Sequence, residues 1–202
     1  RMGQVQFRAI RNHAQHCTRG FLAITDYKDP VILDEFEADP LAALEPASEL
    51  QARLIRRAVA VKAKVVSSDL RERTSSGADI GREALNYGHT LGHAIERQEH
   101  FLLRHGQAVA VGMVFAAELA HQLGMIDADL VARHRRVLHL AGLPTSYPEG
   151  VWLTLRDTMS LDKKSRGSRL RFVLLNGLGA PTIVSGPSEG ALAKAFLTLN
   201  EA

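Results

Sequence analysis

Apolar residues recur at helical spacing along most of this chain. A first helix is predicted to begin at Asp29-Pro30, because aspartate caps helices and proline suits their first position. After breaks at Pro40 and Pro46, an amphipathic helix is expected over about residues 48–69. Its apolar face would comprise Leu50, Leu54, Ile55, Ala58, Val59, Ala63 and Val66.

The remaining pattern is also helical, apart from one hairpin. Further helices are expected over residues 80–99, 107–123, 127–140, 151–159 and 188–199. The helix over 107–123 is apolar on nearly all sides, which is typical of a buried central helix. Strands are expected only at residues 169–175 and 182–184, joined through Asn176-Gly177. The sequence therefore predicts a mainly α protein: a helical bundle with one small antiparallel β-hairpin near the C-terminus.

Two regions are expected. Residues 1–28 have no sustained apolar period and are predicted to form an atypical, irregular segment, whereas residues 29–202 form the helical domain. Within that domain, residues 73–79 read as a polar Gly/Ser loop, and Gly142-Leu143-Pro144 ends the helix over 127–140.

Composition restricts the class of protein further. Of the 202 residues, 46% are hydrophobic and 23% are charged, as in ordinary soluble globular proteins. A net charge of +3 with dispersed arginines argues against nucleic acid as the main partner. Cys17 is the only cysteine, so a disulfide within the chain and a Cys-rich zinc site are excluded, and a reducing, cytoplasmic location is expected. The sequence shows neither a long apolar run nor a signal-peptide pattern, so no membrane partner is expected.

Three histidines carry the candidate chemistry. His89 and His93 are one helical turn apart, so their imidazoles can converge, and His105 follows where a loop could return to the same volume. Such a cluster can bind zinc, transfer protons or hold a phosphate, although a histidine pair at this spacing is also common by chance. Gly88, Gly92 and Gly106 flank the three histidines and favour a role, because glycine in a helix costs roughly 1 kcal/mol and indicates close approach by a ligand or another backbone.

The order of several motifs points to a family. These motifs are Lys62-Ala63-Lys64-Val65-Val66, Leu85-Asn86-Tyr87-Gly88-His89-Thr90-Leu91-Gly92-His93-Ala94-Ile95-Glu96, His105-Gly106, Gly142-Leu143-Pro144, Asp162-Lys163-Lys164 and Leu170-Arg171-Phe172-Val173-Leu174-Leu175. Together they resemble the C-terminal domain of 3-dehydroquinate synthase, a sugar-phosphate cyclase, over about residues 29–202. The resemblance implies a helical domain that binds metal and substrate.

The resemblance also implies an activity. Members of this family convert 3-deoxy-arabino-heptulosonate 7-phosphate to 3-dehydroquinate and phosphate in the shikimate pathway, which makes them carbon–oxygen lyases. They use catalytic NAD and a divalent metal, zinc or cobalt. A phosphorylated sugar acid is therefore the expected substrate, and the full-length family is expected to form homodimers.

Site residues follow from the same resemblance. It implies that His89 and His105 are metal ligands and that His93 lies beside the substrate phosphate. It further implies substrate-binding or catalytic roles for Lys62, Glu72, Arg82, Asn86, Lys163 and Lys164. Arg82 and Asn86 are expected on the helix face that carries His89. By contrast, His121, His134 and His139 are expected to be structural.

Two features of the family are missing from the sequence. The family holds NAD mainly in an N-terminal α/β domain with a Gly-rich turn, and no such turn occurs here. The third metal ligand of the family is a glutamate just before the region that matches Asp29-Pro30, yet residues 1–34 contain no glutamate. We therefore expect negligible synthase activity and weak metal affinity for this chain alone, with the NAD-binding domain supplied from elsewhere.

Other functions stay open. The long loop at 73–79, and Gln107 where glutamate is common, leave room for a related cyclase that makes 2-deoxy-scyllo-inosose, an aminodehydroquinate or an epi-valiolone. The chain could also be a non-catalytic helical remnant, or a subunit that docks onto a separate NAD-binding domain.

Overall fold

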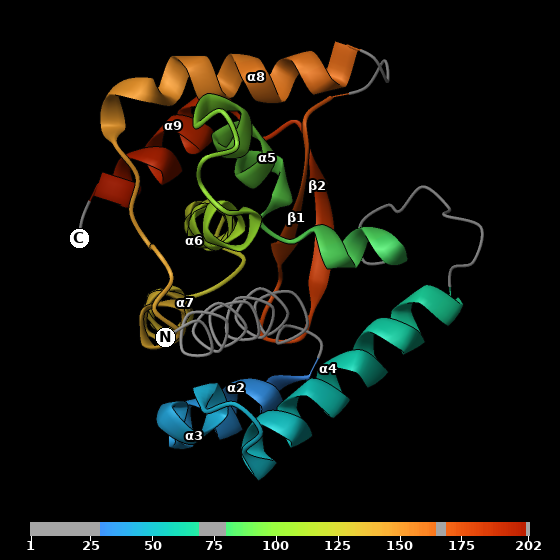
Figure 1. Cartoon of the computed structure of the whole chain (residues 1–202). Helices are drawn as coiled ribbons and strands as arrows, with labels where there is room; N and C mark the ends of the chain where they lie inside the picture. The colour runs from blue at the N-terminus through green and yellow to red at the C-terminus, as the bar shows by residue number, and fades with distance from the viewer. Residues whose placement is uncertain (1–28, 69–79, 165–168, 201–202) are drawn as a thin grey trace, which may run out of the picture.

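The computed structural model describes residues 29–68, 80–164 and 169–200 (Figure 1). The side chains of residues 68 and 161–164 lie outside that description, as do Glu72 and the predicted irregular segment 1–28. The described helices are α2 (Pro30–Ala38), α3 (Pro40–Leu44), α4 (Glu49–Ser68), α5 (His89–Gln98), α6 (His105–Gln122), α7 (Ala128–Leu140), α8 (Trp152–Lys164) and α9 (Glu189–Leu197). Short 3-10 helices lie at Arg82–Asn86, Glu149–Val151 and Thr198–Asn200. The mainly α fold with one hairpin is thus confirmed.

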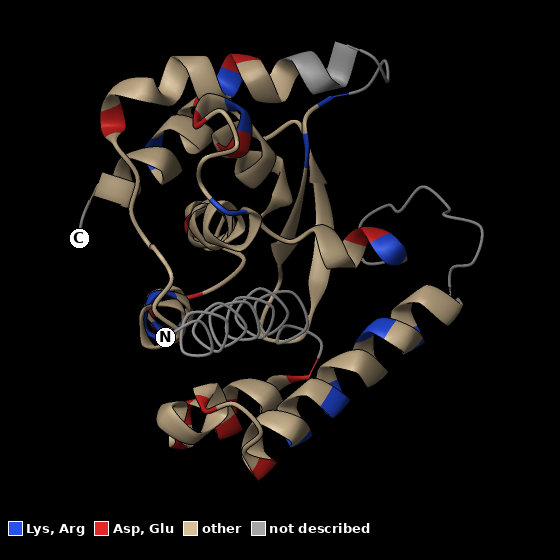
Figure 2. Ribbon diagram, in the orientation of Figure 1, with Lys and Arg blue, Asp and Glu red and all other residues tan. Residues whose placement is uncertain are grey.

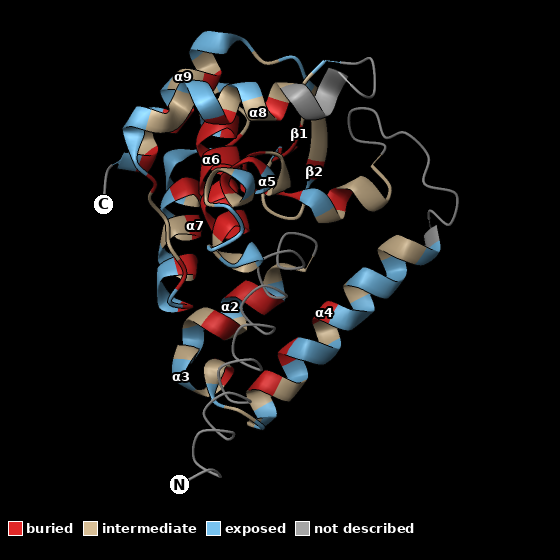
Figure 3. Ribbon diagram, turned by 45° about the horizontal axis from the view of Figure 1, so that its top comes forward, coloured by how far each residue is buried: buried red, intermediate tan, exposed pale blue. Residues whose placement is uncertain are grey.

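Helix α6 forms the centre of the bundle. It is seen end-on in Figure 1, with α5, α7, α8, α9 and the hairpin arranged around it. Every residue from Ala108 to Ala120 is buried, which confirms the prediction of a central helix (Figure 3). The aromatic ring of Phe115 lies 5.9 Å from that of Phe172 on the hairpin, measured between ring centroids. Among the described residues, none of the helices is both long enough and apolar enough to span a bilayer.

The histidine-bearing segment is not one helix, contrary to expectation. A 3-10 helix covers Arg82–Asn86, and the chain then turns through Gly88, which has a left-handed φ of 77°, before α5 begins at His89. The prediction that Arg82 and Asn86 share an α-helical face with His89 is therefore wrong. The turn arises because Gly88 packs against the backbone of α6, a tertiary contact that the periodicity does not report.

Glycines allow α5 and α6 to cross at backbone contact. A Cβ added to Gly112 would lie 2.0 Å from the carbonyl oxygen of Gly88 and 3.0 Å from the amide nitrogen of Gly92. The close approach predicted from the glycine spacing is thus an approach of two backbones. It fixes the position of the helix that carries His89 and His93.

Strand β1 (Arg171–Leu175) of the hairpin and helix α9 pack against α6. The hairpin pairs β1 with β2 (Pro181–Ser185), antiparallel, with Val173 opposite Ile183. The prediction placed the end of the preceding helix near residue 159, whereas α8 continues to Lys164. Helix α7 begins as predicted, because the Asp127 carboxylate accepts a hydrogen bond from the Leu130 amide at 2.9 Å.

Helices α2, α3 and α4 lie beside this bundle. Acidic residues gather on α2 and on the turns at either end of α3, whereas the Lys and Arg residues of this region lie on α4 (Figure 2). Asp29 does not cap α2 through its side chain as predicted, because its carboxylate pairs with Arg57 of α4 at 3.0 Å. Of the predicted apolar face of α4, Leu54 and Ala58 are buried, whereas Val59 is 52% exposed. The periodicity thus predicts the helix correctly, but it does not predict which residues of its apolar face are buried.

Candidate active site

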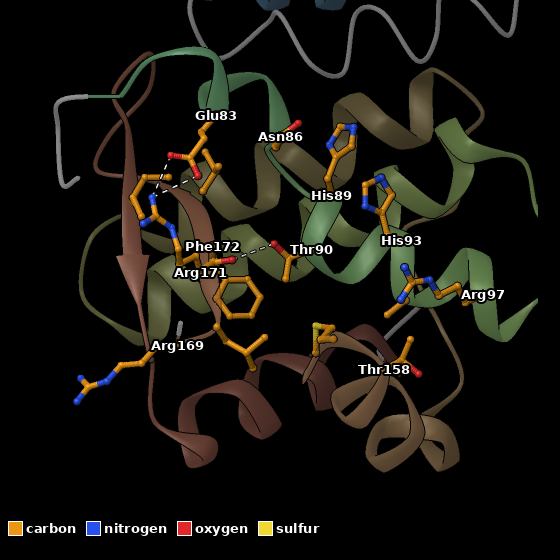
Figure 4. A pocket seen from close by; sticks show the side chains of 15 residues that line it. Glu83, Asn86, His89, Thr90, His93, Arg97, Thr158, Arg169, Arg171 and Phe172 are labelled. Atoms are coloured by element: carbon orange, nitrogen blue, oxygen red, sulfur yellow. Dashed lines mark hydrogen bonds and ion pairs between the residues drawn. The ribbon is translucent and has the colours of Figure 1, made fainter. Parts of the chain in front are cut away.

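A pocket of about 340 Å³ opens where α5, α8 and the hairpin meet. Its polar lining comprises Glu83, Asn86, His89, Thr90, His93, Arg97, Thr158, Arg169 and Arg171. In Figure 4 the rings of His89 and His93 project from α5, with Asn86 just before them, while Arg169 extends away from the other labelled side chains. The apolar lining includes Phe172, and a hydrogen bond from the Thr90 hydroxyl to the Arg171 carbonyl oxygen (3.0 Å) joins α5 to β1.

The three predicted histidines lie together. The ring centroid of His89 is 5.3 Å from that of His93 and 5.2 Å from that of His105, and the His93 and His105 centroids are 5.9 Å apart. His89 and His105 are the first residues of α5 and α6, so the crossing of these helices brings the rings together. The convergence expected from the spacing is confirmed, and the roles of the rings stay predictions.

His89 is held in the form that can bind a metal. Its Nδ1 lies 3.1 Å from the Tyr87 carbonyl oxygen, and because a carbonyl can only accept, Nδ1 carries the proton and Nε2 keeps its lone pair. Burial lowers the pKa of His89 to about 4, a shift that the hydrogen bond to Tyr87 opposes and that His93 and His105 reinforce. The imidazole is therefore neutral at pH 7.

Hydrogen bonds through His134 hold the buried side chain of Tyr87 in place. The Tyr87 side chain is 1% exposed, and its hydroxyl donates to Nε2 of His134 at 3.1 Å. Nδ1–H of His134 in turn donates to the Leu130 carbonyl oxygen at 2.6 Å. His134 is thus structural, as expected, and it anchors the residue whose carbonyl orients His89.

The cluster suits a zinc or cobalt ion. Two imidazoles on one tetrahedral zinc place their ring centroids roughly 5 Å apart, given a Zn–N distance of about 2.0–2.1 Å. The separation of 5.2 Å between His89 and His105 agrees with this geometry. One ligand atom each of His93, Glu96 and His105 also lies within 4.8 Å of the others. This second group contains His105 but not His89, and its imidazole nitrogens and carboxylate oxygen are also donors that suit zinc.

Several predicted residues lie apart from the pocket or outside the description. Lys62 is an exposed residue of α4, and neither it nor Arg82 lines the pocket. Lys163 and Lys164 end the backbone of α8, with side chains outside the described part. Glu72 also lies outside it. The structure thus gathers Asn86, His89, His93 and His105, and the roles of the others stay predictions.

Two arginines that the sequence does not single out also line the pocket. Arg97 lines the pocket four residues after His93, so the helical spacing itself could have indicated it. Arg171 also lines the pocket and pairs with Glu83 at 2.9 Å. That pair joins β1 to the 3-10 helix, a contact between distant segments for which the sequence holds no local signal.

We expect weak zinc binding that depends on His89. The two predicted histidine ligands leave the rest of the coordination sphere to water, and His89→Ala should remove detectable binding. His93→Ala should keep it, because His93 is predicted to face substrate. Isothermal titration calorimetry with zinc measures both effects, with exposed His139→Ala as the control. Tight one-to-one binding that His89→Ala removes would contradict the expected weakness.

Comparison with known proteins identifies the family. The family model described as 3-dehydroquinate synthase C-terminal matches residues 23–165, more than half of the chain. The chain therefore belongs to the 3-dehydroquinate synthase family and corresponds to its C-terminal domain.

Curated relatives carry the same name. The chain is 58% identical over 177 residues to 3-dehydroquinate synthase of Thermobifida fusca, an alignment that covers 88% of this chain and 45% of the relative. It is 52% identical over 187 residues to that of Rhodococcus erythropolis, which covers 93% of this chain and 48% of the relative. The chain spans about half the length of the curated relatives it matches.

Solved structures confirm the fold. A 2-epi-5-epi-valiolone synthase from Streptomyces hygroscopicus subsp. jinggangensis, with NAD+ and Zn2+ bound, superposes with a TM-score of 0.80 at 23% identity, covering 94% of this chain and 51% of that one. A 2-deoxy-scyllo-inosose synthase complexed with carbaglucose-6-phosphate, NAD+ and Co2+ gives a TM-score of 0.61 at 26% identity, covering 80% of this chain and 44% of that one.

Proposed function

We propose that this chain supplies the metal- and substrate-binding part of a 3-dehydroquinate synthase, which converts 3-deoxy-arabino-heptulosonate 7-phosphate to 3-dehydroquinate and phosphate in the shikimate pathway. The observation that carries the proposal is the convergence of His89, His93 and His105 beside a polar pocket. Identities of 58% and 52% to curated synthases favour this reaction over those of the related cyclases.

His89 and His105 would hold the divalent metal, zinc or cobalt. His89 is suited to this because it is neutral and its Nδ1–H is already engaged by Tyr87. When bound, the metal would act as a Lewis acid towards a substrate oxygen. The protein would contribute fixed ligand orientation, since Tyr87 and Glu96 accept hydrogen bonds from the far nitrogens of the two rings.

The pocket would bind an anionic sugar. His93 and Arg97 both line it, and each presents N–H donors that suit phosphate oxygens. Asn86 offers a side-chain amide that can accept from a substrate hydroxyl and donate to another. These residues would orient the substrate so that its own phosphate lies near the reacting carbon.

The remaining parts of the enzyme would lie outside this domain. We place NAD binding on a separate N-terminal domain, consistent with coverage of 45% and 48% of the two curated relatives. The assembled enzyme would be a cytoplasmic homodimer. The two structural neighbours named above, both with NAD+ bound, are about twice as long as the region they share with this chain.

Phosphate release tests the proposal. We expect no release from 3-deoxy-arabino-heptulosonate 7-phosphate by the chain alone, and measurable release when it is mixed with the N-terminal part of the Thermobifida fusca relative, NAD and zinc. The His93→Ala chain should release little phosphate in the same mixture, because the substrate phosphate loses a predicted donor.

The control is Glu189→Gln, which alters a surface ion pair between Glu189 of α9 and Arg156 of α8. Its phosphate release should match that of the unaltered chain. Absence of release in every mixture would favour the non-catalytic alternative. Release from a different sugar phosphate, and not from this substrate, would favour a related cyclase.

A further inference from the structure

The carboxylate of Glu96 contacts the ring of His105, the second predicted metal ligand. Both side-chain oxygens of Glu96 lie 3.1 Å from Nδ1 of His105. Glu96 follows His93 by three residues and His89 by seven on α5, so all three lie on one helix face. Its side chain is only 14% exposed, whereas that of His105 is 52% exposed. The carboxylate is thus largely enclosed while it faces the imidazole.

This contact determines which nitrogen of His105 carries the proton. An ionised carboxylate can only accept, so in the neutral imidazole the proton lies on Nδ1 and Nε2 keeps the lone pair that a metal requires. His89 has the same arrangement, with the Tyr87 carbonyl oxygen as acceptor. For His93, no acceptor of this kind is found in the described part of the chain. The two rings with engaged Nδ1 atoms are therefore the two predicted ligands.

We propose that Glu96 is a positioning residue that fixes the tautomer and the orientation of His105 for metal binding. The proposal rests on the proposed function, in which His89 and His105 hold the metal. Ligand atoms of His93, Glu96 and His105 lie within 4.8 Å of one another, so Glu96 could also be a direct ligand. Its two equal contacts to Nδ1 favour the positioning role, because a carboxylate engaged on that side of the ring lies behind the nitrogen that faces the metal.

The first test reads the tautomer without any metal. Long-range 1H–15N spectra of the full chain at pH 8 should show His105 with its proton on Nδ1. In Glu96→Gln the proton should shift towards Nε2, because the neutral amide is a weaker acceptor and can itself donate to Nδ1. Glu96→Ala, which offers no acceptor and suits a helix, should show the same shift. The Glu189→Gln control should not change the spectrum.

The second test reads metal affinity. Cobalt(II) titrations followed by absorption should show about tenfold weaker binding for Glu96→Gln, the lower end of the range for loss of an outer-shell partner. A change in the cobalt spectrum as large as that of His105→Ala would instead identify Glu96 as a direct ligand and overturn the positioning role.

The outcomes separate the two proposals. A His105 tautomer that is unchanged in both Glu96 variants overturns the role of Glu96, whatever the metal does. Cobalt binding that does not respond to His89→Ala overturns the proposed metal site. The tautomer measurement, made without metal, still tests the effect of Glu96 on His105 independently.

Discussion

Gly112→Ala is expected to lower the free energy of unfolding by about 3 kcal/mol, the upper part of the range for inserting a methyl group into packed structure. The new Cβ would lie 2.0 Å from the Gly88 carbonyl oxygen, a backbone atom that cannot move aside alone. Helix α5 would have to separate from α6 and would carry His89 away from His105. Urea denaturation followed by circular dichroism measures the loss.

Gly190→Ala is the matched control for this substitution. Gly190 also lies in a helix, α9, but nothing lies within 4 Å of an added Cβ. Alanine there should be neutral or stabilising by up to about 1 kcal/mol, because it favours the helix. Equal stability of the Gly112→Ala chain and the unaltered chain would show that the two helices are not held at backbone contact.

Acid should destabilise the fold through His134. Burial lowers its pKa to about 4, the hydrogen bond to Leu130 opposes this shift, and the charge of Arg133 adds to it. The unfolded chain has the ordinary pKa of 6.5, so between pH 6.5 and 4 it binds a proton that the folded state refuses. The contribution of His134 to stability is complete above about pH 6.5 and falls as the pH drops, by about 3 kcal/mol near pH 4. His89, whose pKa burial also lowers to about 4, adds a loss in the same direction.

Urea denaturation across this pH range, with two variants, isolates the effect. His134→Gln keeps a neutral hydrogen-bonding side chain, and its stability should fall by about 3 kcal/mol less than that of the unaltered chain. His139→Gln removes an exposed histidine from the same helix and should leave the pH profile unchanged. Parallel profiles for the unaltered and His134→Gln chains would rule out His134 as an acid-sensitive group.

The predictable part of the fold was the part set by local pattern. Helix α6 was found because its residues are apolar on all sides, and α7 because Asp127 caps it. The turn at Gly88 was missed because it depends on α6, which lies later in the chain. The exposure of Val59 on α4 was missed because periodicity identifies an apolar face without its partner.

The site was predictable to a similar degree. Helical spacing and the resemblance brought His89, His93 and His105 together correctly. The sequence does not distinguish Glu96 and Arg97, although they follow His93 by three and four residues, because charged residues on a helix surface are usually solvated. Only the return of His105 to α5 shows what Glu96 faces.

The starting points of α5 and α6 have an electrostatic consequence. His89 and His105 each begin a helix, so the positive ends of two helix dipoles point towards the same corner. This field favours an anion and opposes a lone cation. A divalent ion held there is therefore stabilised by a negatively charged group beside it, and by reciprocity the ion strengthens the binding of that group. We expect metal and phosphorylated substrate to bind this corner cooperatively.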